Sequence, residues 1–206
     1  METLSTIAAK EDGYSLVEIL VVVGIMAIIG GMSVAQLQTT RNNLRGDSAM
    51  RVVLSNMNSA REMAITQRRY IRVTFDTTAQ TLSIIREDTP TTTTTLSVAL
   101  FEGGAQFYRV TGTGDTPDGF AATCGAGQPS CFYNTTNGTF ASATGSTSVV
   151  KFSPDGTLVD WNGVTTNGTV FTTIPSANPA ARAVTVLGST GRVRAYKWDG
   201  RQWVKV

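Results

Sequence analysis

The sequence predicts an α+β fold in which a long N-terminal helix packs on an antiparallel β-sheet head. Three observations support this prediction. Residues 16–38 form an apolar run broken by one charge, and residues 39–69 keep a helical period but become amphipathic. Residues 70–206 contain short strand patterns separated by Gly, Pro and Asn turns. A length of 206 residues fits one domain with an anchor better than two full domains.

The apolar run reads LVEILVVVGIMAIIGGMSVAQLQ. Its length is about that of a helix crossing a bilayer, which needs about 20 residues at a rise of about 1.5 Å each. A secretory signal peptide has a shorter apolar region, and its small-residue cleavage site comes after that region. We therefore expect residues 14–38 to form a transmembrane helix.

The segment GYSLVEIL at residues 13–20 resembles the processing site of type IV pilins and type II secretion pseudopilins. The resemblance implies that a prepilin peptidase cuts between Gly13 and Tyr14 and methylates the new N-terminal amine. Residues 1–13 would then be a leader peptide. The leader departs from the family because it ends in Lys-Glu-Asp-Gly, without a basic residue before the glycine. Arg41 and Arg45 follow the apolar run, so the expected orientation rests on the resemblance and not on the positive-inside rule.

Glu18 is the one charge in the apolar run. A carboxylate at the centre of a membrane helix costs about 2.5–3.5 kcal/mol. Glu18 can reach the interface, or it can pair after cleavage with the amine of Tyr14 on its own or a neighbouring chain. The resemblance implies the neighbour, because this glutamate sets subunit register in pilins. Ala27, Gly31 and Ala35 recur at steps of four, a spacing that suits close helix packing in a filament or a dimer.

Residues 39–69 are predicted to continue the helix in amphipathic form. Their apolar residues advance by threes and fours and mark one stripe that should pack on the head. The stripe consists of Met50, Val53, Leu54, Met57, Ala60 and Ala64. Gly46 lies before it and predicts a bend.

The strand patterns begin after this helix. Residues 70–75 and 81–85 read as two strands around a polar turn. With the preceding NSAREMAITQRR, they resemble the opening of the FimT/GspH head domain. Residues 91–95 are a threonine run that we expect to be an exposed loop, and residues 96–101 and 105–110 are expected to be further strands.

Residues 111–148 are polar and poorly periodic, so we expect long loops there. They contain the two cysteines, Cys124 and Cys131. In an oxidising compartment these residues would form a short disulfide staple, and two free thiols remain the alternative. The chain has no histidine, which makes a zinc site improbable.

The region from residue 149 onward predicts four or five antiparallel strands joined by Pro-Asp-Gly, Asn-Gly and other glycine turns. The segments FSPDGT and AVTVLGSTGRVRAY resemble the C-terminal half of the FimT/GspH domain. The resemblance covers both ends of the chain and leaves the middle unmatched. It implies a type IV pilin fold and a minor pilin or pseudopilin of the bacterial inner membrane. The head of such a subunit lies in the periplasm or on the filament, and its partners are other pilins.

The candidate binding residues are Arg192 and Arg194, in Gly-Arg-Val-Arg. On a strand their side chains share one face with Tyr196 and Trp198. Guanidinium groups bind phosphates and flat rings stack on unpaired bases, so the pattern is compatible with DNA. It also resembles the DNA-binding motif of FimT-type minor pilins. The alternative is an ordinary solvated face of a sheet, since so short a motif occurs often by chance.

The sequence argues against catalysis. It lacks histidine, the commonest general base, and has no Gly-x-Ser-x-Gly motif. The formal net charge of +2 says little about partners. We expect no catalytic residues, no metal site and no cofactor. The leading hypothesis is a structural subunit of a pilus or pseudopilus, and DNA capture is a second hypothesis.

Overall fold

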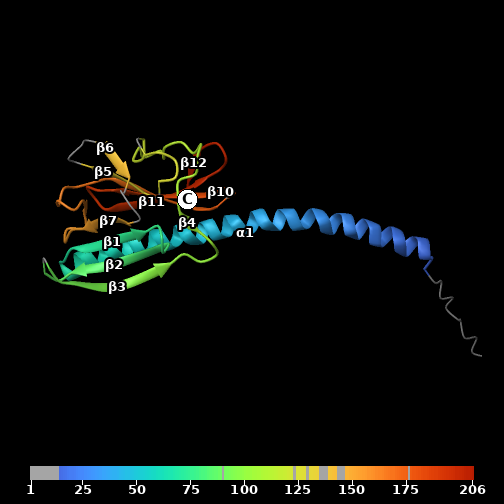
Figure 1. Cartoon of the computed structure of the whole chain (residues 1–206), viewed down its shortest axis with the longest axis horizontal. Coiled ribbons are helices and arrows are strands. Elements are labelled where there is room, and N and C mark those ends of the chain that lie inside the picture. Colours follow the sequence, from blue (N-terminus) through green and yellow to red (C-terminus); the bar gives the residue numbers. More distant parts are fainter. Residues whose placement is uncertain are drawn as a thin grey trace, which may run out of the picture. The chain divides into compact units, whose positions relative to one another are not determined.

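The computed structural model describes residues 14–89, 91–122, 124–128, 130–134, 139–142, 147–175 and 177–206 (Figure 1). The chain separates into two compact units, Met1–Thr40 and Arg41–Val206. Gly13 and the rest of the expected leader lie outside the described residues.

The long N-terminal helix is present as α1 (Leu16–Gln67). In the first unit its large apolar side chains are exposed from Leu16 to Leu37. This part is long and apolar enough to cross a membrane by length and composition, with a mean hydropathy of 2.4 over 18 residues. An apolar surface of this extent calls for lipid or protein around it.

In the second unit α1 buries the predicted stripe. Met50, Val53, Met57, Ala60 and Ala64 are all fully or almost fully buried, and the predicted stripe is confirmed. Leu54 is partly buried and packs against the same core. The residues that recur by threes and fours in the sequence are therefore the ones that face the core.

Gly46 has a packing role. The helix continues through this position, and a Cβ added there would lie 2.6 Å from the carbonyl oxygen of Ala180. Only glycine lets the helix approach that backbone so closely. Next to it, the carboxylate of Asp47 accepts a hydrogen bond of 2.6 Å from Nε of the buried Arg182. This ion pair and the close contact hold α1 against the head at the start of the second unit.

The strands of the second unit form two antiparallel sheets, where the sequence pattern predicted one. The first has five strands in the order β3-β2-β1-β7-β8, and the second has seven, in the order β12-β11-β10-β9-β5-β6 with β4 pairing with β9. The first consists of β1 (Ile71–Asp76), β2 (Thr81–Glu87), β3 (Thr93–Leu100), β7 (Thr147–Phe152) and β8 (Leu158–Val159). The second consists of β4 (Gln106–Phe107), β5 (Ser130–Asn134), β6 (Thr139–Ser142), β9 (Gly168–Ile174), β10 (Ala177–Leu187), β11 (Arg192–Trp198) and β12 (Trp203–Lys205).

Two loop expectations were wrong in part. The threonine run is exposed as expected, but Thr93 to Thr95 belong to β3, because threonine is β-branched and suits an edge strand. Residues 111–148 also contain β5, β6 and the start of β7. The strand expected at residues 105–110 is reduced to β4, which has two residues.

β3 forms one edge of the first sheet. Its sequence, TTTLSVAL, contains neither a charged residue nor proline. Val98 and Leu100 are 59% and 61% exposed.

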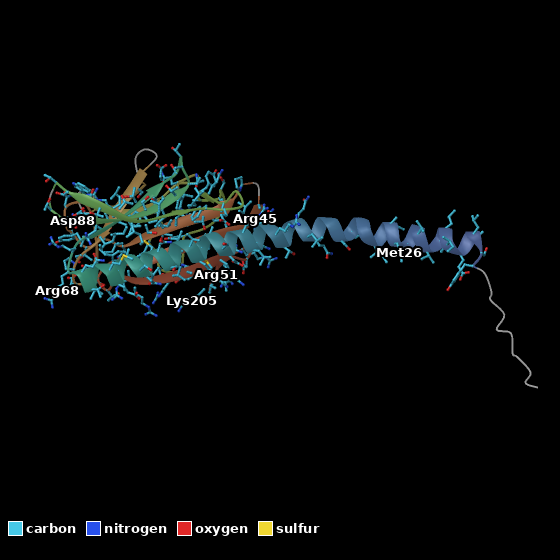
Figure 2. All side chains as sticks on the ribbon, turned by 90° about the horizontal axis from the view of Figure 1, so that it is seen from below. Met26, Arg45, Arg51, Arg68, Asp88 and Lys205 are labelled. Atoms are coloured by element: carbon cyan, nitrogen blue, oxygen red, sulfur yellow. A yellow bond between two sulfur atoms is a disulfide. The ribbon has the colours of Figure 1, made fainter. Side chains whose placement is uncertain are left out.

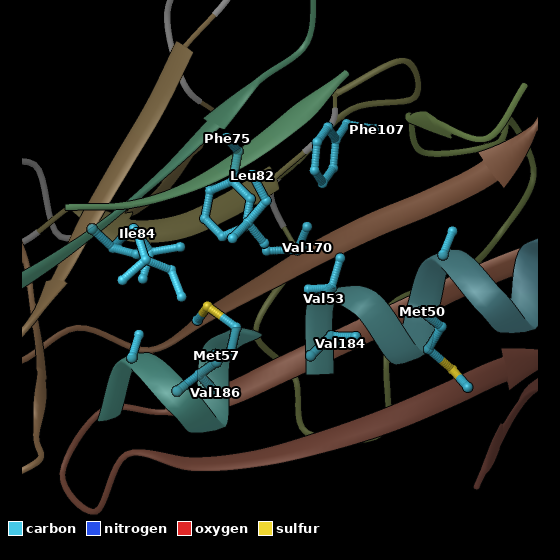
Figure 3. Close-up of a cluster of buried hydrophobic side chains, with 14 of the residues drawn as sticks. Met50, Val53, Met57, Phe75, Leu82, Ile84, Phe107, Val170, Val184 and Val186 are labelled. Atoms are coloured by element: carbon cyan, nitrogen blue, oxygen red, sulfur yellow. The ribbon is translucent and has the colours of Figure 1, made fainter. Parts of the chain in front are cut away.

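The main core lies between α1 and both sheets (Figure 3). Met57 and Val53 of α1 belong to the same buried cluster as Phe75 of β1, Ile84 of β2 and Val184 of β10. Each large apolar side chain buried there stabilises the fold by about 1.5–3 kcal/mol. The predicted fold class, a helix packed on antiparallel sheet structure, is confirmed for the head.

A second, smaller core lies on the other side of the second sheet. Residues 108–122 and 124–128, here called the covering loop, supply Ala121 and Cys124 to it. The sheet contributes Phe171, Tyr196 and Trp203, among others. The face of β11 that carries Tyr196 therefore lies under the covering loop.

Candidate functional site

The N-terminal site lies in the first unit. The backbone N–H groups of Glu18 and Ile19 donate to the carbonyl oxygen of Ser15, at 3.0 and 3.2 Å, so Ser15 is the residue that precedes the first helical residue, Leu16. Glu18 is in the first turn, where the partial positive charge of a helix N-terminus favours a carboxylate. Tyr14 and Glu18 line a hollow of about 450 Å³ together with Ile19, Val22 and Val23. The acidic side chain and the expected new N-terminal residue are thus close together.

Three segments that carried the family resemblance meet in the head. Arg61, from the NSAREMAITQRR segment of α1, donates a hydrogen bond of 3.3 Å from Nε to the carbonyl oxygen of Gly156. Gly156 belongs to the FSPDGT turn. Gly191, the glycine of Gly-Arg-Val-Arg, has a φ of +62°, and a Cβ added there would lie 2.1 Å from the Gly156 oxygen. The motif glycine therefore has a packing explanation, since no other residue fits between the turn and the helix.

The FSPDGT turn is held by its aspartate. The Asp155 carboxylate accepts hydrogen bonds from the hydroxyl of Ser153 and from the backbone N–H and hydroxyl of Thr157. These bonds lower the pKa of Asp155 to about 2, with the Ser153 hydroxyl contributing most. Asp155 therefore has a conformational role that needs no catalysis.

Arg194 is not a free cation. Its guanidinium forms an ion pair with Asp118 of the covering loop. The same carboxylate accepts hydrogen bonds from the hydroxyls of Thr185, at 2.6 Å, and Tyr196, at 2.9 Å. Burial acts to raise the pKa of Asp118, but these three hydrogen bonds outweigh it, and the pKa lies below its usual value. Asp118 is therefore the centre of a polar cluster on the outer face of the second sheet.

The other residues expected on the same face of β11 as Arg194 differ in their exposure to solvent. Arg192 is exposed at the start of β11. Tyr196 is buried, and Trp198 is half-buried against Trp203, with ring centroids 5.3 Å apart. The two rings belong to the second core and are not available as open stacking platforms. Of these four residues, Arg192 alone is exposed.

The covering loop is held in place by hydrogen bonds from one buried arginine and by a disulfide. The guanidinium of the buried Arg109 donates to the carbonyl oxygens of Ala121, Cys124, Thr113 and Gly114. Cys124 and Cys131 form a disulfide, with their Cα atoms 6.0 Å apart. Because β5 begins at Ser130, the disulfide fastens the end of the loop to the sheet.

The chain is similar to a solved type IV minor pilin. That structure is FimU of Pseudomonas aeruginosa strain PAO1, with a TM-score of 0.43 and 14% sequence identity over 77% of this chain and 91% of that one. No protein-family model matches the sequence, and no curated protein matches it. An overlap of this extent leaves the function to be argued from the chain's own residues.

Sequence reasoning missed Asp118 and Arg109. Asp118 stands in a Pro-Asp-Gly segment that reads as a surface turn, and Arg109 in a stretch that reads as a strand. Their roles come from contacts with residues far along the chain, which local patterns do not record. Among the described residues, no group of three or more His, Cys, Asp or Glu side chains is placed to hold a metal ion.

Proposed function

We propose that this protein is a structural subunit of the pilin class, a minor pilin or pseudopilin that assembles through its N-terminal helix. The supporting observation is the change of character along α1. Its apolar side chains are exposed in the first unit and buried against two sheets in the second. The first kind of surface requires lipid or other helices around it, and the second holds a folded head.

We further propose how the chain is processed and where in the cell it is held. A prepilin peptidase cuts after Gly13 and methylates Tyr14, which leaves Glu18 as the fifth residue of the mature chain. The new amine of one subunit and Glu18 of its neighbour then neutralise each other in the apolar setting. The subunit is held in the bacterial inner membrane with its head in the periplasm before it joins a type II secretion pseudopilus or a type IV pilus.

The test is the mass of the mature chain isolated from cells with a working prepilin peptidase. We expect a chain that begins with methylated Tyr14, and Gly13→Val should leave the full-length precursor. Asp12→Asn changes the neighbouring residue and should be cut normally. Retention of Met1 in the unaltered protein would contradict the proposal.

A second test addresses Glu18. Glu18→Gln keeps the shape of the side chain and removes its charge, so processing should continue while recovery in sheared filaments falls. If Glu18→Gln is recovered in filaments as fully as the unaltered chain, the residue has no role in assembly.

DNA capture is a second candidate function, favoured by the exposure of Arg192 and by its position two residues from Arg194 on β11. Under this hypothesis DNA phosphates compete with Asp118 for Arg194. Gel-shift binding should weaken with rising salt and with Arg192→Ala plus Arg194→Ala. Arg51→Ala removes an exposed arginine of α1 and serves as the control. Equal binding by all these proteins would leave the structural role alone.

A further inference from the structure

A hollow of about 640 Å³ lies where α1 ends and β1, β2 and β7 meet the segment after β8. Its lining includes Arg68, Tyr70, Arg72, Glu87, Lys151 and Trp161, and we call it the Trp161 pocket. Figure 2 shows Arg68 and Asp88, another lining residue, at the same end of the head. None of its lining residues lies in the apolar segment 16–38, and neither Arg192 nor Arg194 lines it.

Two aromatic rings are open at this pocket. Trp161 is 63% exposed and Tyr70 is 41% exposed. The guanidinium carbon of Arg72 lies 4.8 Å from the centroid of the Trp161 ring, and Nζ of Lys151 lies 4.9 Å from that of Tyr70. The two cations hold the rings in place and leave most of the indole surface to solvent. A large exposed indole held in this way is suited to stacking on a flat ligand face.

The pocket contains charges of both signs. Glu87 accepts a hydrogen bond of 2.7 Å from Arg72 and lies 3.9 Å from Nζ of Lys151. The cations are therefore fixed by a carboxylate that itself faces the pocket. Asp88 and Asn162 also line it, and the Asp88 carboxylate pairs with Arg86 and accepts a hydrogen bond from Thr94. A ligand here meets hydrogen-bond donors and acceptors together.

Arg68 is the cation without a fixed partner. Among the described residues no hydrogen bond or ion pair engages its guanidinium. Its φ is +52°, a left-handed conformation that helices usually give to glycine at their C-terminal end. The N–H of Arg69 bonds to the carbonyl oxygen of Ala64, at 3.3 Å, and completes this cap. An arginine thus stands at a position that favours glycine, and its side chain lines the pocket.

We propose that the Trp161 pocket binds a uronic-acid-containing oligosaccharide. The carboxylate of the sugar would bind Arg68, its apolar ring face would stack on Trp161, and its hydroxyl groups would donate to Glu87 and Asp88. The two carboxylates of the pocket decide the class of ligand. They accept hydrogen bonds from hydroxyl groups, which a sugar carries in number, whereas the phosphates of a nucleic acid strand are acceptors only and offer them none.

The test uses the full chain in detergent, titrated with a galacturonate hexamer and followed by calorimetry. We expect binding, and about tenfold weaker binding for Trp161→Ala and for Arg68→Gly, which each remove one principal contact. A neutral galactose hexamer should bind at least about tenfold more weakly, since it lacks the charged group. Arg51→Ala is the control and should bind as the unaltered chain does.

Arg68→Gly separates binding from folding, because glycine accepts the left-handed conformation more readily than arginine. Its melting temperature should be unchanged or higher while its affinity falls. Absence of binding to the galacturonate hexamer, or binding unchanged in both variants, would overturn the proposal. Equal or tighter binding of a thymidine hexanucleotide or a glutamate hexapeptide would overturn it in favour of a nucleic acid or an acidic protein.

Discussion

Asp118 of the covering loop forms an ion pair with Arg194 of β11, 76 residues further along the chain. The contact gives one of the two candidate DNA-binding arginines a role inside the head. It also makes the loop and the sheet depend on each other, since Thr185 and Tyr196 donate to the same carboxylate.

Asp118→Asn should destabilise the head by about 1–3 kcal/mol, because an amide cannot accept all three hydrogen bonds and leaves Arg194 unpaired. Urea unfolding followed by tryptophan fluorescence measures the change. Glu102→Gln removes a carboxylate from the exposed surface and should have an effect below about 0.5 kcal/mol. Equal stability of the two variants would mean that the cluster does not hold the loop.

The stability of the head should fall in acid, partly through Asp118. Although burial acts to raise it, the pKa of this carboxyl is lower in the folded chain than the ordinary value of an aspartate, because of its hydrogen bonds from Thr185, Tyr196 and Arg194. The folded state therefore binds the proton less readily than the unfolded state does. The contribution is fully present above the unfolded pKa of about 3.9 and is lost as pH falls through the folded pKa. The difference in unfolding free energy between the unaltered chain and Asp118→Asn should accordingly shrink from pH 7 to pH 2.

Gly191→Ala should destabilise the head by about 2–4 kcal/mol, since it combines a left-handed backbone with a clash against Gly156 and Arg61. Gly104 has a φ of +80° with nothing within 4 Å of an added Cβ, so Gly104→Ala tests the backbone effect alone. That control should cost about 1–2 kcal/mol. A loss no larger for Gly191→Ala than for Gly104→Ala would show that the contact with the turn contributes nothing.

Replacement of both Cys124 and Cys131 by serine should lower the stability of the head by about 2–3 kcal/mol, from the loop-closure entropy of a short loop. Reduction of the disulfide in the unaltered chain should lower the unfolding free energy by a similar amount, which is measured as a fall in melting temperature when a reductant is added. A melting temperature that does not respond to reductant would indicate that native material contains free thiols.

The elements that the sequence predicted well are those with local periodicity. The stripe from Met50 to Ala64 follows the helical repeat, and the first hairpin and the β10–β11 hairpin follow alternation and turn chemistry. Each of these patterns is formed by residues that lie only a few positions apart in the sequence. They also gave the expected position of Arg192 and Arg194 on one strand.

The division into two sheets could not be predicted in the same way. β7 pairs with β1 rather than with β9, a choice that depends on the packing of α1 between the sheets. The burial of Tyr196 beneath the covering loop and the pairing of Arg194 are equally non-local. Each depends on how a long polar segment folds back, and its sequence shows only turns.

β3 has a practical consequence for handling the head. An edge strand without charge or proline offers its free backbone groups to any other extended chain, and Val98 and Leu100 add exposed hydrophobic surface. Concentrated preparations should therefore precipitate through this edge. Val98→Lys, on the solvent side of the strand, should keep them clear without disturbing the interior.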